Sequence, residues 1–173
     1  MFTFPVTSML AAISGAGSLT IAAGSGSPLT LGVAATHTGA TTIDAGLILG
    51  GPDFLHDTSD VTLGAVGVLT LGGSETINTL TGAAGTSIII GGSTLTVVQD
   101  ADATFAGAIS GAGGALVKNG AGKLTLSGAS GYTGATTVNA WTLNIQNATA
   151  TGTTAGGVTV AAGASLELQG GIA

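Results

Sequence analysis

The sequence predicts an all-β protein that folds as a right-handed parallel β-helix (β-solenoid) of short strands. Many short segments alternate Leu, Val or Ile with Thr, which is the period of a strand with one buried face. Gly makes up 32 of the 173 residues, a content that disfavours helices. A long phrase of the sequence also recurs roughly 95 residues later, which is typical of proteins built from stacked repeats.

The expected strands follow one another along the whole chain, and each is a short stretch of aliphatic or β-branched residues. Between them lie Gly, Ala, Ser, Asn and Asp, which permit the sharp corners of a solenoid. With roughly 20 to 25 residues per coil, the chain would make about seven or eight coils. The expected strands are 18–21, 28–31, 41–44, 47–50, 61–64, 68–71, 87–90, 94–97, 123–126, 136–139, 142–145, 158–161 and 165–168.

The internal repeat is clearest where LTLGVAATHTGATTIDAG, residues 29–46, matches LTLSGASGYTGATTVNAW, residues 124–141, with 10 of 18 positions identical. Weaker matches lie on both sides of this one. We therefore predict a single β-solenoid over residues 1–173, made of about 1.8 copies of a unit of about 96 residues, 1–96 and 97–173. We expect equivalent strands to lie above one another and to reuse the same inward ladders of Leu, Ile and Val. The central Thr of each strand should point outward in a rank, an arrangement with which some solenoids bind ice, although Thr is also simply a good strand former.

The composition excludes several classes of function. The chain has eight acidic residues but only two cationic ones, Lys118 and Lys123, so it cannot neutralise phosphates and nucleic acid is excluded as a partner. We expect the two Lys to keep one turn soluble. No long run of purely apolar residues occurs, so the chain is not expected to span a membrane. Cys is absent, which removes disulfides and thiolate metal sites.

The segment FAGAISGAGGALVKNGAGKLTLSGASGYTGATTVNAWTLNIQN, residues 105–147, repeats Gly at its turns and Leu, Thr and Ile in its strands. It resembles the autotransporter-associated β-strand repeat, which is found in passenger regions of large bacterial type V secreted proteins. A degenerate copy occupies about residues 11–49. The resemblance implies a right-handed parallel β-helix, a location outside the cell or on the bacterial surface, and a non-enzymatic role as stalk or adhesin scaffold. The family usually has Gly where Trp141 stands. The matching positions are Gly111, Gly113, Gly114, Leu116, Lys118, Gly120, Gly122, Leu124, Leu126, Gly128, Tyr132, Gly134, Thr136, Thr137, Leu143 and Ile145.

The most polar stretch is GPDFLHDTSD, residues 51–60, which contains Asp53, His56, Asp57 and Asp60. Such a group could bind a divalent cation or act as acid and base, but its spacing matches no calcium-loop pattern. A solvated loop that protrudes from one coil is the simpler interpretation. We predict no catalytic residue, no cofactor and no metal, with Asp53, Asp57 and Asp60 as the only metal candidates. Parallel β-helices also include polysaccharide lyases and hydrolases, which leaves a polysaccharide-active enzyme as a minor alternative.

Two aromatic residues, Trp141 and Tyr132, are candidates for contact with a partner, because an aromatic face stacks on sugars and anchors protein interfaces. Host or matrix glycans and proteins are the corresponding partner classes. The sequence begins with the strand-like FTFPV and stops at QGGIA without an obvious polar cap, which predicts self-association end to end or side to side. A self-assembling extracellular filament is therefore the alternative to a structural or adhesive passenger segment.

Overall fold

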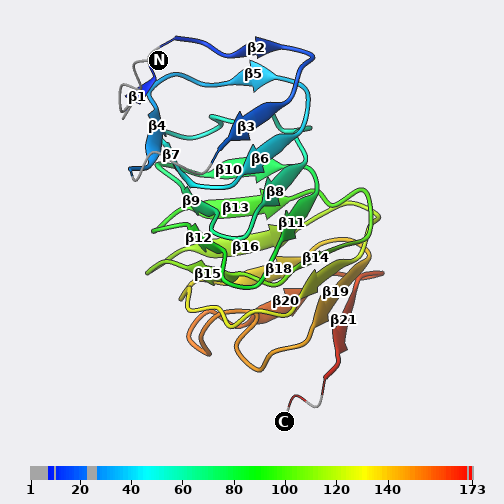
Figure 1. Cartoon of the computed structure of the whole chain (residues 1–173). Coiled ribbons are helices and arrows are strands. Elements are labelled where there is room, and N and C mark those ends of the chain that lie inside the picture. The colour runs from blue at the N-terminus through cyan, green and yellow to red at the C-terminus, as the bar shows by residue number, and fades with distance from the viewer. Residues whose placement is uncertain (1–7, 10, 23–26, 171, 173) are drawn as a thin grey trace.

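The computed structural model describes residues 8–9, 11–22, 27–170 and 172, and in these ranges it is all-β, without a helix. Its strands pair in parallel and stack into a β-solenoid of about seven turns, with residues 14–15 and 165–168 at opposite ends of the rod (Figure 1). The predicted fold class is confirmed. The stretch FTFPV, which we expected to be strand-like, lies outside the described residues.

The strands form three long sheets along the rod and one short sheet near its start. The six-stranded sheet contains β1 (Ser8–Met9), β4 (Leu29–Leu31), β7 (Gly46–Leu49), β9 (Val68–Thr70), β12 (Ser87–Ile89) and β15 (Ala108–Ser110). The eight-stranded sheet contains β3 (Leu19–Ile21), β6 (Thr41–Ile43), β8 (Val61–Leu63), β11 (Leu80–Gly82), β14 (Ala103–Phe105), β17 (Leu124–Leu126), β19 (Thr142–Ile145) and β21 (Ser165–Leu168). The five-stranded sheet contains β10 (Glu75–Ile77), β13 (Thr94–Val97), β16 (Ala115–Lys118), β18 (Thr136–Val138) and β20 (Val158–Val160), and the short sheet contains β2 (Ser14–Gly15) and β5 (Thr36–His37).

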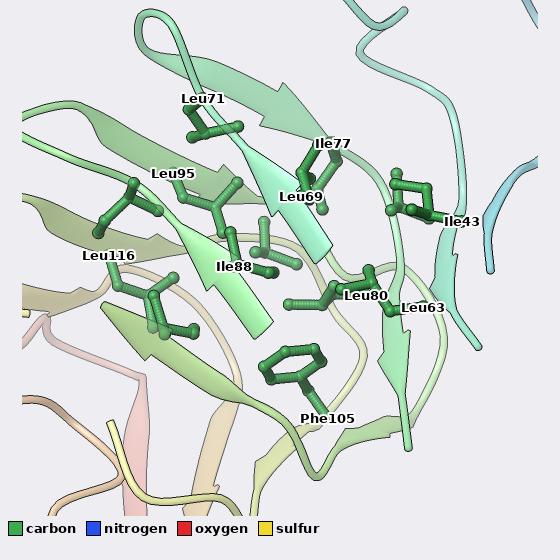
Figure 2. Packing of buried hydrophobic residues seen from close by; sticks show 14 of the residues in the cluster. Ile43, Leu63, Leu69, Leu71, Ile77, Leu80, Ile88, Leu95, Phe105 and Leu116 are labelled. Atoms are coloured by element: carbon green, nitrogen blue, oxygen red, sulfur yellow. The ribbon is translucent and has the colours of Figure 1, made fainter. Parts of the chain in front are cut away.

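The core consists of stacked ladders of aliphatic side chains, to which each of the three long sheets contributes. In the six-stranded sheet, Leu47, Leu69, Ile88 and Ile109 follow one another in register, and all four are completely buried. Figure 2 shows Leu69 and Ile88 of this ladder pointing toward the inward residues of the other sheets. Burial of one such side chain contributes about 1.5–3 kcal/mol, so the repeated ladders are the main source of stability.

The outward positions of the eight-stranded sheet form a rank of threonines, as the sequence predicts. Six consecutive strands place Thr at the same register position, and on the next two strands the rank continues with Asn144 and Glu167. The threonines of this rank are Thr20, Thr42, Thr62, Thr81, Thr104 and Thr125.

The two copies of the sequence repeat do not lie on the same side of the rod, so our expectation that equivalent strands stack above one another is wrong. Residues 41–43 lie in the eight-stranded sheet, whereas the matching residues 136–138 lie in the five-stranded sheet. Likewise, Leu31 lies in the six-stranded sheet and Leu126 in the eight-stranded one, although both are buried. Paired residues along the eight-stranded sheet differ by 19 to 23 in number, so a unit of about 96 residues falls between four and five coils.

Candidate functional site

The polar loop at residues 50–60 takes the place of a strand. It connects β7 to β8, and the Ala35 N–H, just before β5, donates a hydrogen bond to the Phe54 carbonyl oxygen at 2.7 Å. Asp53 has a φ of 52°, a left-handed conformation that interrupts a strand. Leu55 and Ser59 are buried, while Asp53, Asp57 and Asp60 are exposed. The loop is therefore anchored to the core by part of its length and presents its acidic side chains to solvent.

A buried carboxylate fastens this loop to the next coil. Glu75, the first residue of β10, is only 1% exposed, and its two carboxylate oxygens accept hydrogen bonds from the Phe54 and Leu55 N–H groups, each at 2.9 Å. Burial raises the pKa of Glu75 to about 7; the two N–H donors lower it, and the nearby Asp53 and Asp57 raise it further. The carboxylate therefore accepts the N–H groups of Phe54 and Leu55, which in a strand would bond to the backbone of a neighbouring strand.

Sequence reasoning missed Glu75, although a signal was present. Glu75 lies two residues before Ile77, so the two side chains point to the same face of the strand, and Ile77 is apolar and buried. A charged residue at an inward position of a strand requires a polar partner inside the protein. The expected strands did not include residues 75–77, so this inward position was overlooked.

The sequence-predicted residues of the loop have different surroundings: Asp60 is held by hydrogen bonds, whereas Asp53, His56 and Asp57 line one depression. Asp60 Oδ1 accepts hydrogen bonds from Asn78 Nδ2 at 3.0 Å and from the Thr79 N–H at 3.2 Å, which fixes the end of the loop. His56 Nδ1 interacts with the hydroxyl of Thr58 at 2.9 Å. Asp53, His56 and Asp57 line a shallow depression of about 450 Å³ beside Thr36. Within the described ranges, no group of three or more His, Asp or Glu side chains is placed to hold a metal ion.

Lys118 does not keep a turn soluble, and that expectation is wrong. It is completely buried at the end of β16, and its Nζ donates hydrogen bonds to the carbonyl oxygens of Asn119, Gly120 and Ala140 at 2.8, 2.9 and 3.2 Å. Burial lowers the pKa of Lys118 to about 8, while Asp102 and Asp100 raise it. The side chain satisfies carbonyl groups of two successive corners, so its function is structural.

Tyr132 is buried as well, so its ring is not accessible to a partner. Its hydroxyl lies 2.5 Å from Thr136 Oγ1, and burial raises the pKa of Tyr132 to about 12. The equivalent residue of the first copy is His37, whose Nε2 lies 2.9 Å from Thr41 Oγ1 and which is 2% exposed. In both copies an aromatic side chain reaches the Thr four residues later, and this internal contact accounts for part of the repeated phrase.

Of the two contact candidates, only Trp141 lies at the surface, with 57% of its area exposed. It has a φ of 54°, which is unusual for a residue other than Gly. The first copy has Gly46 at the matching sequence position, and a Cβ there would lie 2.7 Å from Pro28 Cβ. Trp141 is therefore an exposed aromatic residue in a conformation that Gly would adopt more easily.

Comparison with known families agrees with these features. Residues 28–49 and 116–145 match the family model of the passenger-associated-transport repeat. Two segments of the chain are therefore similar to the passenger-associated-transport repeat. The first repeat includes β4 to β7 with the His37–Thr41 contact, and the second includes β16 to β19 with the Tyr132–Thr136 contact. The predicted resemblance to autotransporter passenger repeats is thereby confirmed.

The passenger-associated-transport repeat is a structural repeat of passenger proteins and is not a known enzyme family. It suggests a surface or secreted protein. No curated protein and no solved structure gives a significant match to the chain. In the part of the chain that the structure describes, no helix has the length and apolarity needed to cross a membrane.

Proposed function

We propose that the chain is a non-enzymatic structural and adhesive segment of a bacterial surface or secreted passenger protein. The observation that carries this proposal is the position of two segments similar to the passenger-associated-transport repeat inside one continuous stack of parallel strands. In a solenoid each coil contacts only its neighbours, so folding can begin at one end and proceed coil by coil. Such folding suits a chain that leaves the cell unfolded and acquires its structure outside.

An export assay tests this proposal. The chain is placed between an export signal and the translocator of a bacterial autotransporter, and surface display is measured by antibody labelling and resistance to added protease. Wild type should be displayed and resistant. Leu69→Asp, which buries a charge in the core ladder, should be displayed less or digested faster. Poor display of the wild type, or equal display and resistance of both, would contradict the proposal.

Filament formation is a second proposal, and one observation favours it. Val158 and Val160 in β20 are each 39% exposed and Leu168 in β21 is 63% exposed, and among the described residues both strands pair on one side only. An unpaired strand edge next to apolar side chains is a template for another chain. Sedimentation velocity at increasing concentration tests it: growing assemblies that Leu168→Glu abolishes are expected, and a concentration-independent monomer would refute it.

A further inference from the structure

The outer face of the eight-stranded sheet changes character in its last two strands. Along the first six strands its outward rank is Thr, and on β19 and β21 longer polar side chains follow. We call these side chains the polar platform. The polar platform consists of Thr142, Asn144 and Gln146 in and after β19, and of Ser165, Glu167 and Gln169 in and after β21.

The polar platform is held together by its own hydrogen bonds. Thr142 Oγ1 lies 2.9 Å from Ser165 Oγ. Asn144 Nδ2 donates to Glu167 Oε2 at 3.1 Å and to Gln169 Oε1 at 3.3 Å, and Gln146 Nε2 donates to Asn144 Oδ1 at 3.1 Å and to Gln169 Oε1 at 3.0 Å. Asn144 is only 3% exposed, so it forms the enclosed centre of a preorganised array.

Several groups of this array remain available to a ligand. In the described part of the chain, no hydrogen bond engages Gln146 Oε1, Glu167 Oε1 or Gln169 Nε2, and these three residues are exposed. Two of these groups are acceptors and one is a donor. From Thr142 to Gln146 the row extends for about 13 Å along the strand. That length suits a short oligosaccharide lying along the sheet.

Trp141 lies at the Thr142 end of the polar platform. Its carbonyl oxygen accepts a hydrogen bond from the Ser165 N–H at 2.7 Å, which ties it to the first row of the array. The corner that contains Trp141 is one residue longer than its counterpart in the first repeat: five positions separate the buried Val138 and Leu143, but four separate Ile43 and Leu47. A left-handed conformation is unfavourable for a residue with a side chain, so the exposed ring of Trp141 is kept at a cost in stability.

We propose that Trp141 and the polar platform form a binding site for a neutral glycan chain. This inference rests on the proposed adhesive function and names its ligand class. A sugar ring has an apolar C–H face that stacks on an indole, and hydroxyl groups that both donate and accept hydrogen bonds. Trp141 at one end of the polar platform, with one free donor and two free acceptors farther along it, matches this chemistry.

The charges around the site favour a neutral glycan over an acidic one. Glu167 belongs to the polar platform, and Lys123 is placed beside Thr142 by the pairing of β17 with β19. The backbone N–H of Lys123 donates to Asp102 Oδ1 at 2.7 Å, so a second carboxylate lies at the backbone of this residue. The balance of these three charges is negative, which repels carboxylated or sulfated sugars.

Binding to a panel of immobilised oligosaccharides tests the proposal. The panel contains neutral oligomers of glucose, mannose and N-acetylglucosamine, together with polygalacturonate as the acidic probe. Wild type should bind at least one neutral oligomer and should not bind polygalacturonate. Trp141→Gly should weaken binding about tenfold or more without lowering the thermal midpoint, because Gly adopts the left-handed conformation without strain. Val66→Ala, a change at another exposed apolar residue, is the matched control and should bind like the wild type.

Two more variants separate the parts of the site. Gln169→Ala removes a free donor and should weaken binding, whereas Glu167→Gln preserves an acceptor and should keep neutral binding while allowing polygalacturonate to bind. Absence of neutral binding, or binding of Trp141→Gly within about twofold of wild type, would overturn the proposal. Trp141→Gly should pass the export assay in either case. A chain that is exported normally but binds no glycan would refute this inference and leave the proposed passenger role intact.

Discussion

The loops at residues 50–60 and 147–157 hold matching places in the two copies of the repeat, yet they are fastened by different chemistry. The first is held by the carboxylate of Glu75, which accepts the Phe54 and Leu55 N–H groups. The second is held by neutral groups: the Thr153 N–H donates to the Tyr132 carbonyl oxygen at 2.9 Å, and Thr136 Oγ1 donates to the Thr151 carbonyl oxygen at 3.1 Å.

The difference shows that the repeat specifies the path of the chain and does not specify which hydrogen bonds hold the loop in place. Both loops bypass a strand, and in both the missing pairing is replaced by a side chain from the neighbouring coil. An ionisable group makes that replacement depend on pH, and a phenol or hydroxyl does not at ordinary pH. The first loop should therefore respond to acid and base, and the second loop should not.

The largest change in the free energy of unfolding is expected from a substitution at the second loop. Tyr132→Ala should lower the free energy of unfolding by about 3–5 kcal/mol, because the ring is completely buried and the chain at Gly152 packs on it. Tyr132→Phe should cost only about 1 kcal/mol, since Thr136 keeps its bond to the Thr151 carbonyl. Urea unfolding followed by circular dichroism measures both. Equal losses for the two variants would mean that the hydroxyl, and not ring packing, fastens the loop.

The next effect is the pH dependence of the first loop. Because the pKa of Glu75 is raised from 4.5 to about 7, the folded protein binds a proton more tightly than the unfolded chain. The cost of the buried charge is absent below pH 4.5, grows as the pH rises, and is complete above about pH 7. The free energy of unfolding should therefore fall across this window, by up to about 3 kcal/mol from this group.

Glu75→Gln is the matched variant for this measurement. It keeps one acceptor for the loop and removes the ionisation, so urea unfolding at several pH values should lose most of the slope between pH 4.5 and 7. Tyr132→Phe should retain that slope. A slope that persists in Glu75→Gln would assign the pH dependence to other groups.

Much of the fold was predictable because its determinants are local in sequence. The alternation of Leu and Thr in segments such as residues 94–97 specifies a strand with one buried face wherever it lies on the rod. The placement of the two copies on different sheets was not predictable in this way. It depends on the summed length of several coils, and corners differ by single residues, as the extra residue at Trp141 illustrates.

The candidate sites were harder to predict from the sequence, because the sequence alone does not distinguish a polar residue buried inside the solenoid from one on its surface. Lys118 and Tyr132 were expected at the surface, and the structure buries both. Lys118 lies at an inward position of β16, and its partner in the next corner, the Ala140 carbonyl, cannot be identified without the stacking register. Tyr132 contacts Thr136 at the start of β18, four residues later, but its burial also depends on the coils around it. Trp141 remained exposed because its corner has one residue more than the corner of the first repeat.

The smallest effect is expected when the first copy receives the aromatic residue of the second, in His37→Tyr. His37 is buried, its Nε2 contacts Thr41, and its Nδ1 has no hydrogen-bond partner among the residues that the structure describes. Burial, followed by the charge of His56, lowers the pKa of His37 below 6.5, so the folded state binds a proton less tightly than the unfolded chain. Its contribution to stability is complete above pH 6.5 and decreases as the pH falls, which is opposite in sign to Glu75.

If the repeated phrase defines its own surroundings on either sheet, Tyr at position 37 should reach Thr41 as Tyr132 reaches Thr136. The free energy of unfolding should then change by no more than about 1 kcal/mol at pH 7.5, and the loss of stability below pH 6.5 should become smaller. Urea unfolding at both pH values measures the two quantities. A loss of several kcal/mol would mean that the first copy has room for an imidazole only, and that the surroundings of the phrase depend on the sheet in which it lies.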